Sequence, residues 1–221
     1  MLCGTLRDMG SPGCRPSDSQ VYARDSVEFG RALAFIDAIF GFSATLLVTN
    51  LDLPSGEQWR SPGTLLGGTV GDQLLSFAIS FVVIAGFWRL NHAVIARFEA
   101  LDSAVITAGL VVAGLVVLIP FTTQGIGDPS TSELALPTAL YAGNVALVVA
   151  ASAVLLTLAR RRGLIRDADT DRRAGLAGYA TTMAVFLVSI PIAYGPGPDA
   201  AQLSWLSLVV LGPVADRLVR R

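Results

Sequence analysis

Six long apolar stretches divide this chain of 221 residues, and each is long enough to cross a lipid bilayer as a helix. A helix rises about 1.5 Å per residue, so about 20 apolar residues span the roughly 30 Å hydrocarbon layer. Charged or turn-forming segments separate the stretches, as expected for loops at the membrane surface. The stretches cover residues 31–51, 73–91, 103–123, 134–158, 175–194 and 202–218.

The composition supports membrane insertion. Apolar residues make up 52% of the chain and charged residues only 15%, whereas soluble domains average roughly 25% charged residues. The apolar stretches also lack the alternation with period two that marks membrane β-strands. Because a lipid-facing span must satisfy its own backbone hydrogen bonds, the sequence predicts an all-α membrane protein with six transmembrane helices per subunit.

The distribution of arginine predicts the orientation in the membrane. All sixteen basic residues are arginines. Fifteen of them lie in the two terminal segments, in the even-numbered connections or at the adjoining ends of the spans, and only Arg60 lies on the other side. By the positive-inside rule, both termini face the cytoplasm. We therefore expect a multi-pass protein of a bacterial plasma membrane. The formal net charge of −1 offers no basic field to nucleic acid.

The N-terminal segment differs from the rest of the chain. Residues 1–28 are polar and contain no apolar core of signal-peptide length, so we expect a flexible cytosolic tail followed by one six-helix membrane domain over residues 29–221. Cys3 and Cys14 lie in this tail and lack the second Cys/His pair that a zinc site requires. No metal site is predicted.

One side of the first span carries hydroxyl groups. At about 100° per residue, a stripe roughly 80° wide holds Ala38, Phe42, Thr45, Thr49 and Asp52. A stripe of this kind can line water when identical helices gather around an axis. Alternatively, the two threonines donate to backbone carbonyls one turn earlier, as is common in membrane helices.

Asp37 is the one carboxylate well within a span. An ionisable group at the bilayer centre costs about 2.5–3.5 kcal/mol on insertion scales, so a partner is expected. The side chain points roughly 100° away from the stripe, toward a neighbouring helix. Trp88 and His92, near the inner end of the second span, are candidate partners. Alternatively, Asp37 is hydrated near the interface and His92 lies among the headgroups.

Four short motifs occur in an order and spacing that match a known family. In R-x-x-x-F-S-D, the matching residues are Arg31, Phe35 and Asp37, with Ile36 in place of serine. The other matches are Thr45-Leu46-Leu47-Val48 closed by Pro54, Trp88 followed by Asn91-His92, and Pro120-Phe121-Thr122. On these residues the chain resembles the transmembrane protein 175 family of potassium channels, found in lysosomes and in many bacteria.

The resemblance implies a specific assembly. Bacterial members are homotetramers of six-span subunits whose first helices line a central cation pathway, so residues 29–221 would form the channel domain. Transferred by position, Phe42 is the constriction, Thr45 and Thr49 are the next layers outward, and Ala38 lines the same pathway. The resemblance also implies an interhelical network that comprises Arg31, Phe35, Asp37, Trp88 and His92.

The resemblance further implies that potassium is the permeant ion, that no cofactor is needed, and that the partners are other copies of the chain and membrane lipid. Phe42 departs from the family, which generally has Ile or Leu there. Four phenyl rings at one level would narrow the path, and a dry constriction can block conduction by dewetting.

Two other functions remain open. A proton-coupled transporter would use Asp37 and His92 as a relay, and a scaffold would not conduct at all. An enzyme is not expected, because the chain contains no G-x-S-x-G, H-E-x-x-H, C-x-x-C or Walker A motif. The arginine-rich connection over residues 160–173 can bind anionic lipid headgroups, although anchoring the topology already accounts for its charge.

Overall fold

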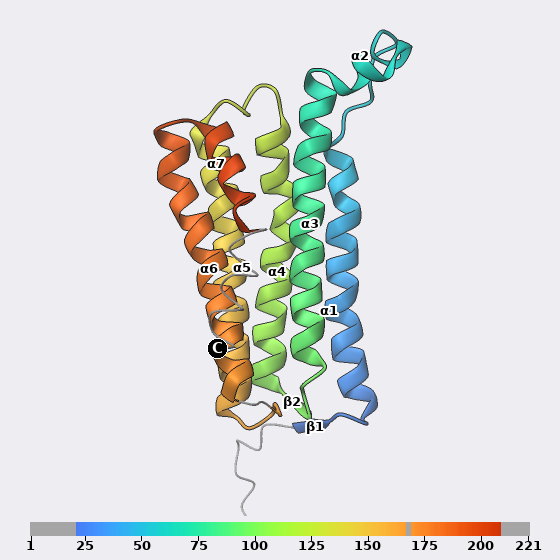
Figure 1. The fold of residues 1–221 in the computed structure, drawn as a ribbon. Helices are drawn as coiled ribbons and strands as arrows, with labels where there is room; N and C mark the ends of the chain where they lie inside the picture. The colour runs from blue at the N-terminus through green and yellow to red at the C-terminus, as the bar shows by residue number, and fades with distance from the viewer. Residues whose placement is uncertain (1–20, 167–168, 209–221) are drawn as a thin grey trace, which may run out of the picture.

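The computed structural model describes residues 21–166 and 169–208. Its main elements are five long helices that run side by side (Figure 1). Each of the five contains a segment that is long and apolar enough to cross a membrane. They are α1 (Val27–Leu46), α3 (Thr69–Ile95), α4 (Ser103–Gly127), α5 (Ala135–Arg161) and α6 (Asp169–Tyr194).

Short elements lie at the two ends of the bundle. The strands β1 (Val21–Ala23) and β2 (Ala100–Asp102) lie at one end, and α2 (Pro62–Leu66) projects from the other (Figure 1). The remaining short elements are the 3-10 helices η1 (Leu47–Asn50) and η2 (Gln58–Arg60) and the helix α7 (Pro198–Trp205). Successive long helices therefore alternate in direction, as the arginine distribution predicts for spans, and Arg60 lies opposite the end that holds β1 and β2.

The first five predicted spans correspond to the five long helices. The predicted sixth span, residues 202–218, begins in α7, but its part beyond residue 208 lies outside the described residues. The predicted boundary of the tail at residue 28 is too late, because Val21–Ala23 already pair with β2 and α1 begins at Val27. Ser26 explains this start: its hydroxyl caps α1 by accepting from the Phe29 amide at 3.2 Å.

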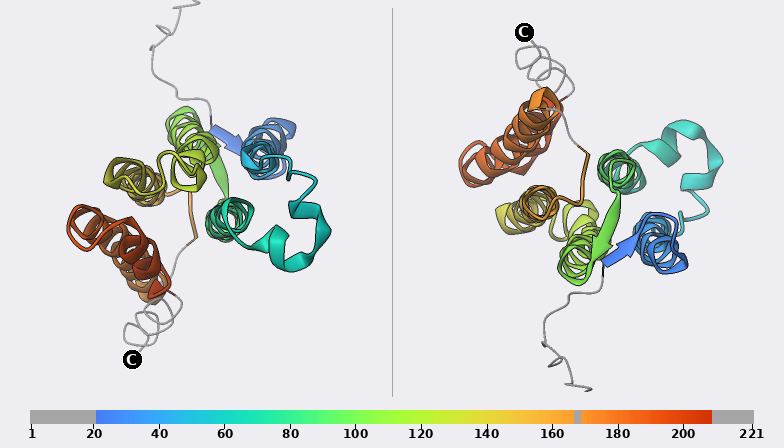
Figure 2. Two further views of the ribbon diagram at one scale, coloured as in Figure 1. Left: turned by 90° about the horizontal axis from the view of Figure 1, so that it is seen from above. Right: turned by 90° about the horizontal axis from the view of Figure 1, so that it is seen from below.

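Helix α4 is the centre of the bundle. Seen along the helix axes, α1 and α3 lie on one side of α4, and α5 and α6 lie on the other (Figure 2). Many of the buried side chains of α4 and α5 are small or β-branched, which lets the two helices approach closely. They include Val112, Ala113, Val116 and Ile119 of α4 and Val145, Val148 and Val149 of α5.

A belt of backbone hydrogen bonds closes the end of the bundle at β1 and β2. The strand β1 pairs antiparallel with β2, the Glu99 amide donates to the Leu164 carbonyl at 2.9 Å, and the Arg166 amide donates to the Arg97 carbonyl at 3.1 Å. The Arg24 guanidinium adds bonds to the carbonyls of Ala96 and Phe98. This belt connects the segment that precedes α1 to the α3–α4 and α5–α6 connections.

Asp102 joins two of these connections. Its carboxylate caps α4 by accepting from the Val105 amide at 2.8 Å and pairs with the Arg162 guanidinium beyond α5. Asp102 is buried and Arg162 is partly exposed. One carboxylate thus accepts from a backbone amide at the start of α4 and neutralises the guanidinium that follows α5.

We expect Asp102→Ala to lower the free energy of unfolding by about 1–3 kcal/mol, because it removes both the helix cap and the ion pair. The thermal midpoint of the detergent-solubilised protein measures the loss. The control is Glu57→Ala, which removes an exposed pair with Arg60 and should leave the midpoint nearly unchanged. Equal midpoints for the two variants would contradict this role of Asp102.

Candidate functional site

One side of α1 packs into the bundle and the other side does not. The buried residues Phe29, Ile36, Phe40, Ser43 and Leu47 recur every three to seven positions and lie against α3 and α4. On the opposite side, the residues predicted to line the pathway are exposed in the single chain. Phe42 is 70% exposed, and Ala38, Thr45 and Thr49 are also exposed.

The hydroxyls of Thr45 and Thr49 donate hydrogen bonds to backbone carbonyls one turn earlier in the chain. The Thr45 hydroxyl donates to the Phe42 carbonyl at 2.8 Å, and the Thr49 hydroxyl donates to the Leu46 carbonyl at 2.7 Å. These bonds use the only hydrogen of each hydroxyl and leave its oxygen lone pairs free on the exposed side. Back-bonding and cation binding are therefore compatible, because a cation is bound by lone pairs and not by the hydrogen.

The helix changes its winding within the predicted stripe. The α-helix ends at Leu46, and the next four residues form η1, in which each residue turns about 120° instead of 100°. Thr49 stays exposed, but the prediction that one α-helical stripe continues to Asp52 is wrong. Leu51 is extended, and the Asp52 carboxylate accepts a hydrogen bond from Gln73 Nε2 at 2.7 Å.

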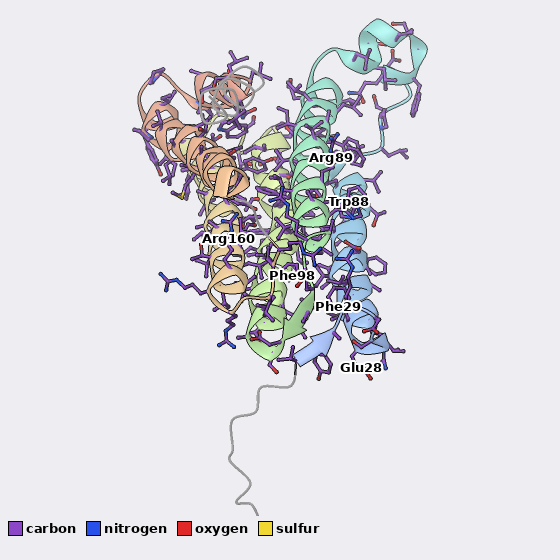
Figure 3. The ribbon with its side chains drawn as sticks, turned by 60° about the horizontal axis from the view of Figure 1, so that its bottom comes forward. Glu28, Phe29, Trp88, Arg89, Phe98 and Arg160 are labelled. Carbon is purple, nitrogen blue, oxygen red and sulfur yellow. The ribbon has the colours of Figure 1, made fainter. Side chains whose placement is uncertain are left out.

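Asp37 lies at the edge of a groove between α1 and α3. The groove has a volume of about 210 Å³, and its lining includes Asp37 and Trp88. Trp88 is labelled on α3 in Figure 3. Within the part of the chain that the structure describes, Asp37 Oδ1 is buried and has no hydrogen-bond partner. His92 stacks on Trp88 with ring centroids 5.4 Å apart and is not part of the groove lining. The structure thus brings Trp88, but not His92, to the groove of Asp37.

The other signature residues differ in exposure. Arg31 and Phe35 lie on the exposed part of α1, and Phe35 is 60% exposed. Ile36, in the position of the family serine, is buried instead. A Cβ added at Gly109 of α4 would lie 2.9 Å from Ile36 Cδ1. Gly109 therefore provides the space that the larger residue needs.

Among the described residues there is no cluster of His, Cys, Asp or Glu that could hold a metal ion. Cys3 and Cys14 lie outside the described residues. Within the part of the predicted stripe that α1 and η1 form, the exposed polar side chains are the neutral hydroxyls of Thr45 in α1 and Thr49 in η1. The arrangement can bind a cation weakly through neutral oxygen atoms, with Phe42 about one turn before Thr45.

Several polar residues of this region were not predicted from the sequence. Gln73 holds Asp52, and Asn50 Nδ2 donates to the Pro120 carbonyl at 2.7 Å. Asn144 of α5 lies beside the turn that precedes Pro120. An uncharged amide side chain inside an otherwise apolar span could have indicated these residues. Such a group needs a hydrogen-bond partner within the membrane.

Comparisons with known proteins identify relatives of this chain. The family described as endosomal/lysosomal potassium channel TMEM175 matches residues 31–120. A protein of Streptomyces collinus named potassium channel is 28% identical over 180 residues, which cover 75% of this chain and 85% of the relative. A potassium channel of Chryseobacterium is 27% identical over 124 residues, or 56% of this chain and 60% of that protein.

A crystal structure has the same fold. It is the lysosomal potassium-selective channel TMEM175 homologue of Chamaesiphon minutus, with a TM-score of 0.64 and 22% identity, and the match covers 89% of this chain and 100% of that one. The apolar helices define a multi-pass helical membrane protein. Over residues 31–120 the chain is similar to the TMEM175 family, and it resembles potassium channels of bacteria.

The packing of Ile36 against Gly109 gives a test of the site's local structure. Ile36→Ser should lower the free energy of unfolding by about 2 kcal/mol or more, because it opens a cavity beside α4. In the double variant, Gly109→Ala should restore part of this loss, since the new methyl group enters the vacated space. Thermal unfolding of the three variants in detergent measures the coupling. Additive effects would contradict the proposed contact.

Proposed function

We propose that the chain is one subunit of a passive potassium-preferring cation channel, in which α1 of several identical copies lines a central pathway. The family and the names of the two bacterial relatives support a potassium channel. The observation that carries the proposal is the exposed side of α1, which holds Phe42, Thr45 and Thr49. A single chain leaves this side uncovered, and symmetry-related copies would cover it.

The assembly is a homotetramer in a bacterial plasma membrane, with six spans per subunit over residues 29–221 and both termini in the cytoplasm. Membrane lipid surrounds the outer helices. Closed symmetry is the rule for soluble homo-oligomers, and it brings the same residue of each α1 to the same level. Four copies then present rings of identical side chains along one axis.

The chemistry of the pathway follows from these rings. Because Thr45 and Thr49 donate their hydrogens to the backbone, their oxygens can replace part of the hydration shell of a cation. Neutral oxygens hold potassium weakly enough to release it, as conduction requires. The ring of Phe42 forms a dry constriction between the threonines and the cytoplasm. No cofactor takes part, and the permeant ion is potassium.

Phe42→Ala should raise potassium flux through proteoliposomes, because four small side chains leave a wider and more easily wetted path. We expect an increase of about tenfold or more, the equivalent of lowering a barrier by about 1.4 kcal/mol. The matched control is Phe121→Ala, which truncates a similarly exposed phenylalanine on α4 and should leave the flux unchanged. Unchanged flux through a folded, reconstituted Phe42→Ala channel would contradict the constriction.

Thr45→Val keeps the shape of the side chain and removes the oxygen that faces the pathway. The ratio of potassium to sodium flux should therefore fall, while the protein still assembles. Thr45→Ser keeps the hydroxyl and should keep most of the preference for potassium. Proteoliposomes that contain either ion measure the ratio. An equal ratio for the valine and serine variants would show that this oxygen does not select the ion.

A proton-coupled transporter is the second candidate, and the unpaired oxygen of Asp37 in its groove favours it. Such a relay would need a second titratable group at the groove. His92, the candidate relay residue, is not part of the groove lining. Flux that saturates at low potassium and follows an imposed pH gradient would support the transporter over the channel.

A further inference from the structure

The helix that carries the threonines is held at its outer end by one polar bond to α4. Asn50, the last residue of η1, donates its side-chain amide to the Pro120 carbonyl at 2.7 Å. Leu47, the first residue of η1, is fully buried, and η1 contacts both α3 and α4. These two residues are the points at which this turn is attached to the rest of the bundle.

The spacing of the two attachments matters. Side chains three residues apart are eclipsed in a 3-10 helix, so Leu47 and Asn50 point to the same side, toward the bundle. Leu47 is held by apolar packing, which has no preferred direction. Asn50 adds a directional bond one turn later. Thr49 lies about 120° from Asn50 around the turn and is directed to the exposed side.

The acceptor of this bond is itself held in place. Pro120 lies inside α4 and has no amide hydrogen for the carbonyl one turn earlier. The buried Asn144 amide of α5, with its nitrogen toward the carbonyl, lies 3.2 Å from Leu115 O and 3.3 Å from Ile119 N. With its amide in this orientation, Asn144 bonds the Leu115 carbonyl and the Ile119 amide in the turn just before Pro120.

A buried chain of hydroxyl groups braces the following turn. The Thr123 hydroxyl lies 2.7 Å from the Ile119 carbonyl and 2.7 Å from the Ser80 hydroxyl of α3. The Ser80 hydroxyl is in turn hydrogen-bonded to the Tyr141 hydroxyl of α5 at 3.1 Å. Two helices, α3 and α5, thus fix α4 around Pro120, and the Pro120 carbonyl is a rigid reference point.

A second link nearby has a different role. Gln73 of α3 is buried and makes two bonds to Asp52: its Oε1 accepts from the Asp52 amide at 3.1 Å, and its Nε2 donates to the carboxylate at 2.7 Å. Between Asp52 and η1 lies Leu51 in an extended conformation. The Gln73 link therefore fixes the loop after the turn, whereas Asn50 fixes the turn itself.

We propose that Asn50 is a positioning residue for the outer threonine ring, because its bond to the Pro120 carbonyl sets the rotation and radial place of the turn that carries Thr49. The ion-selectivity part of this inference rests on the proposed channel function. The structural part, that Asn50 holds η1, does not. Asn50 itself does not touch the ion.

The test uses Asn50→Leu, which keeps the size of the side chain and removes the donor. The rate of amide hydrogen exchange is measured by mass spectrometry on the reconstituted full-length protein. In peptides that cover residues 47–51, this rate should rise by roughly threefold to tenfold. The ratio of potassium to sodium flux should fall as far as it does in Thr49→Val. Asn50→Ser, whose hydroxyl is too short to reach the carbonyl, is the second variant if Asn50→Leu does not fold.

The matched control is Thr131→Ala. This variant removes a hydroxyl in the α4–α5 connection that bonds the Gly125 carbonyl at 2.8 Å and lies 3.5 Å from the Asp128 carbonyl. It should leave both the exchange of residues 47–51 and the flux ratio unchanged. If Thr131→Ala lowers the flux ratio as much as Asn50→Leu does, the effect is general destabilisation and the inference is overturned.

The remaining outcomes separate the inference from the channel proposal. Unchanged exchange in Asn50→Leu would overturn the inference whatever the flux. Faster exchange with an unchanged flux ratio, while Thr49→Val lowers that ratio, would also overturn it and leave the channel intact. If no α1 variant changes flux, the channel proposal fails, and the exchange result alone then decides whether Asn50 holds the turn.

Discussion

The one-sided packing of α1 is the constraint on which the rest depends. The helix lies against α3 and α4 through residues such as Phe40 and Leu47, and leaves Phe42, Thr45 and Thr49 uncovered. In a bilayer, an uncovered side must face either lipid or other protein. Lipid accepts Phe42 readily, but it gives the threonine oxygens no partner beyond their own helix. If copies of the chain meet around a water-filled pathway, Phe42 forms its constriction and the threonine oxygens face the water.

The central helix α4 supports this arrangement because polar groups from its neighbours compensate for its proline. Pro120 interrupts the backbone hydrogen bonds of α4, and Asn144 and Thr123 bond backbone groups of Leu115 and Ile119 in the turn before it. Inside a membrane, such bonds have no competition from water. Their result is a fixed carbonyl to which the outer end of α1 is tied through Asn50. This bond fixes the rotation of α1 about its own axis, although α1 packs against the bundle on one side only.

The sequence predicts the helices better than their contacts. Length and apolar character identify the five described spans, and the helical repeat correctly places Ala38, Phe42 and Thr45 on one exposed side of α1. The repeat fails after Leu46, because the change to a 3-10 turn is set by the contacts of η1 with α3 and α4. The links of Asn50 and Gln73 join residues 70 and 21 positions apart, and neither spacing nor composition reveals such pairs.

The most direct test of the shared axis is oxidative cross-linking of Thr45→Cys in a Cys3→Ser, Cys14→Ser background, carried out in proteoliposomes. If α1 of each copy faces its symmetry mates, the cysteines should form disulfides between copies and give covalent dimers on a denaturing gel. Val154→Cys, which is 62% exposed on α5, should remain monomeric. Dimers through position 154 but none through position 45 would show that α1 faces lipid, and would contradict the account.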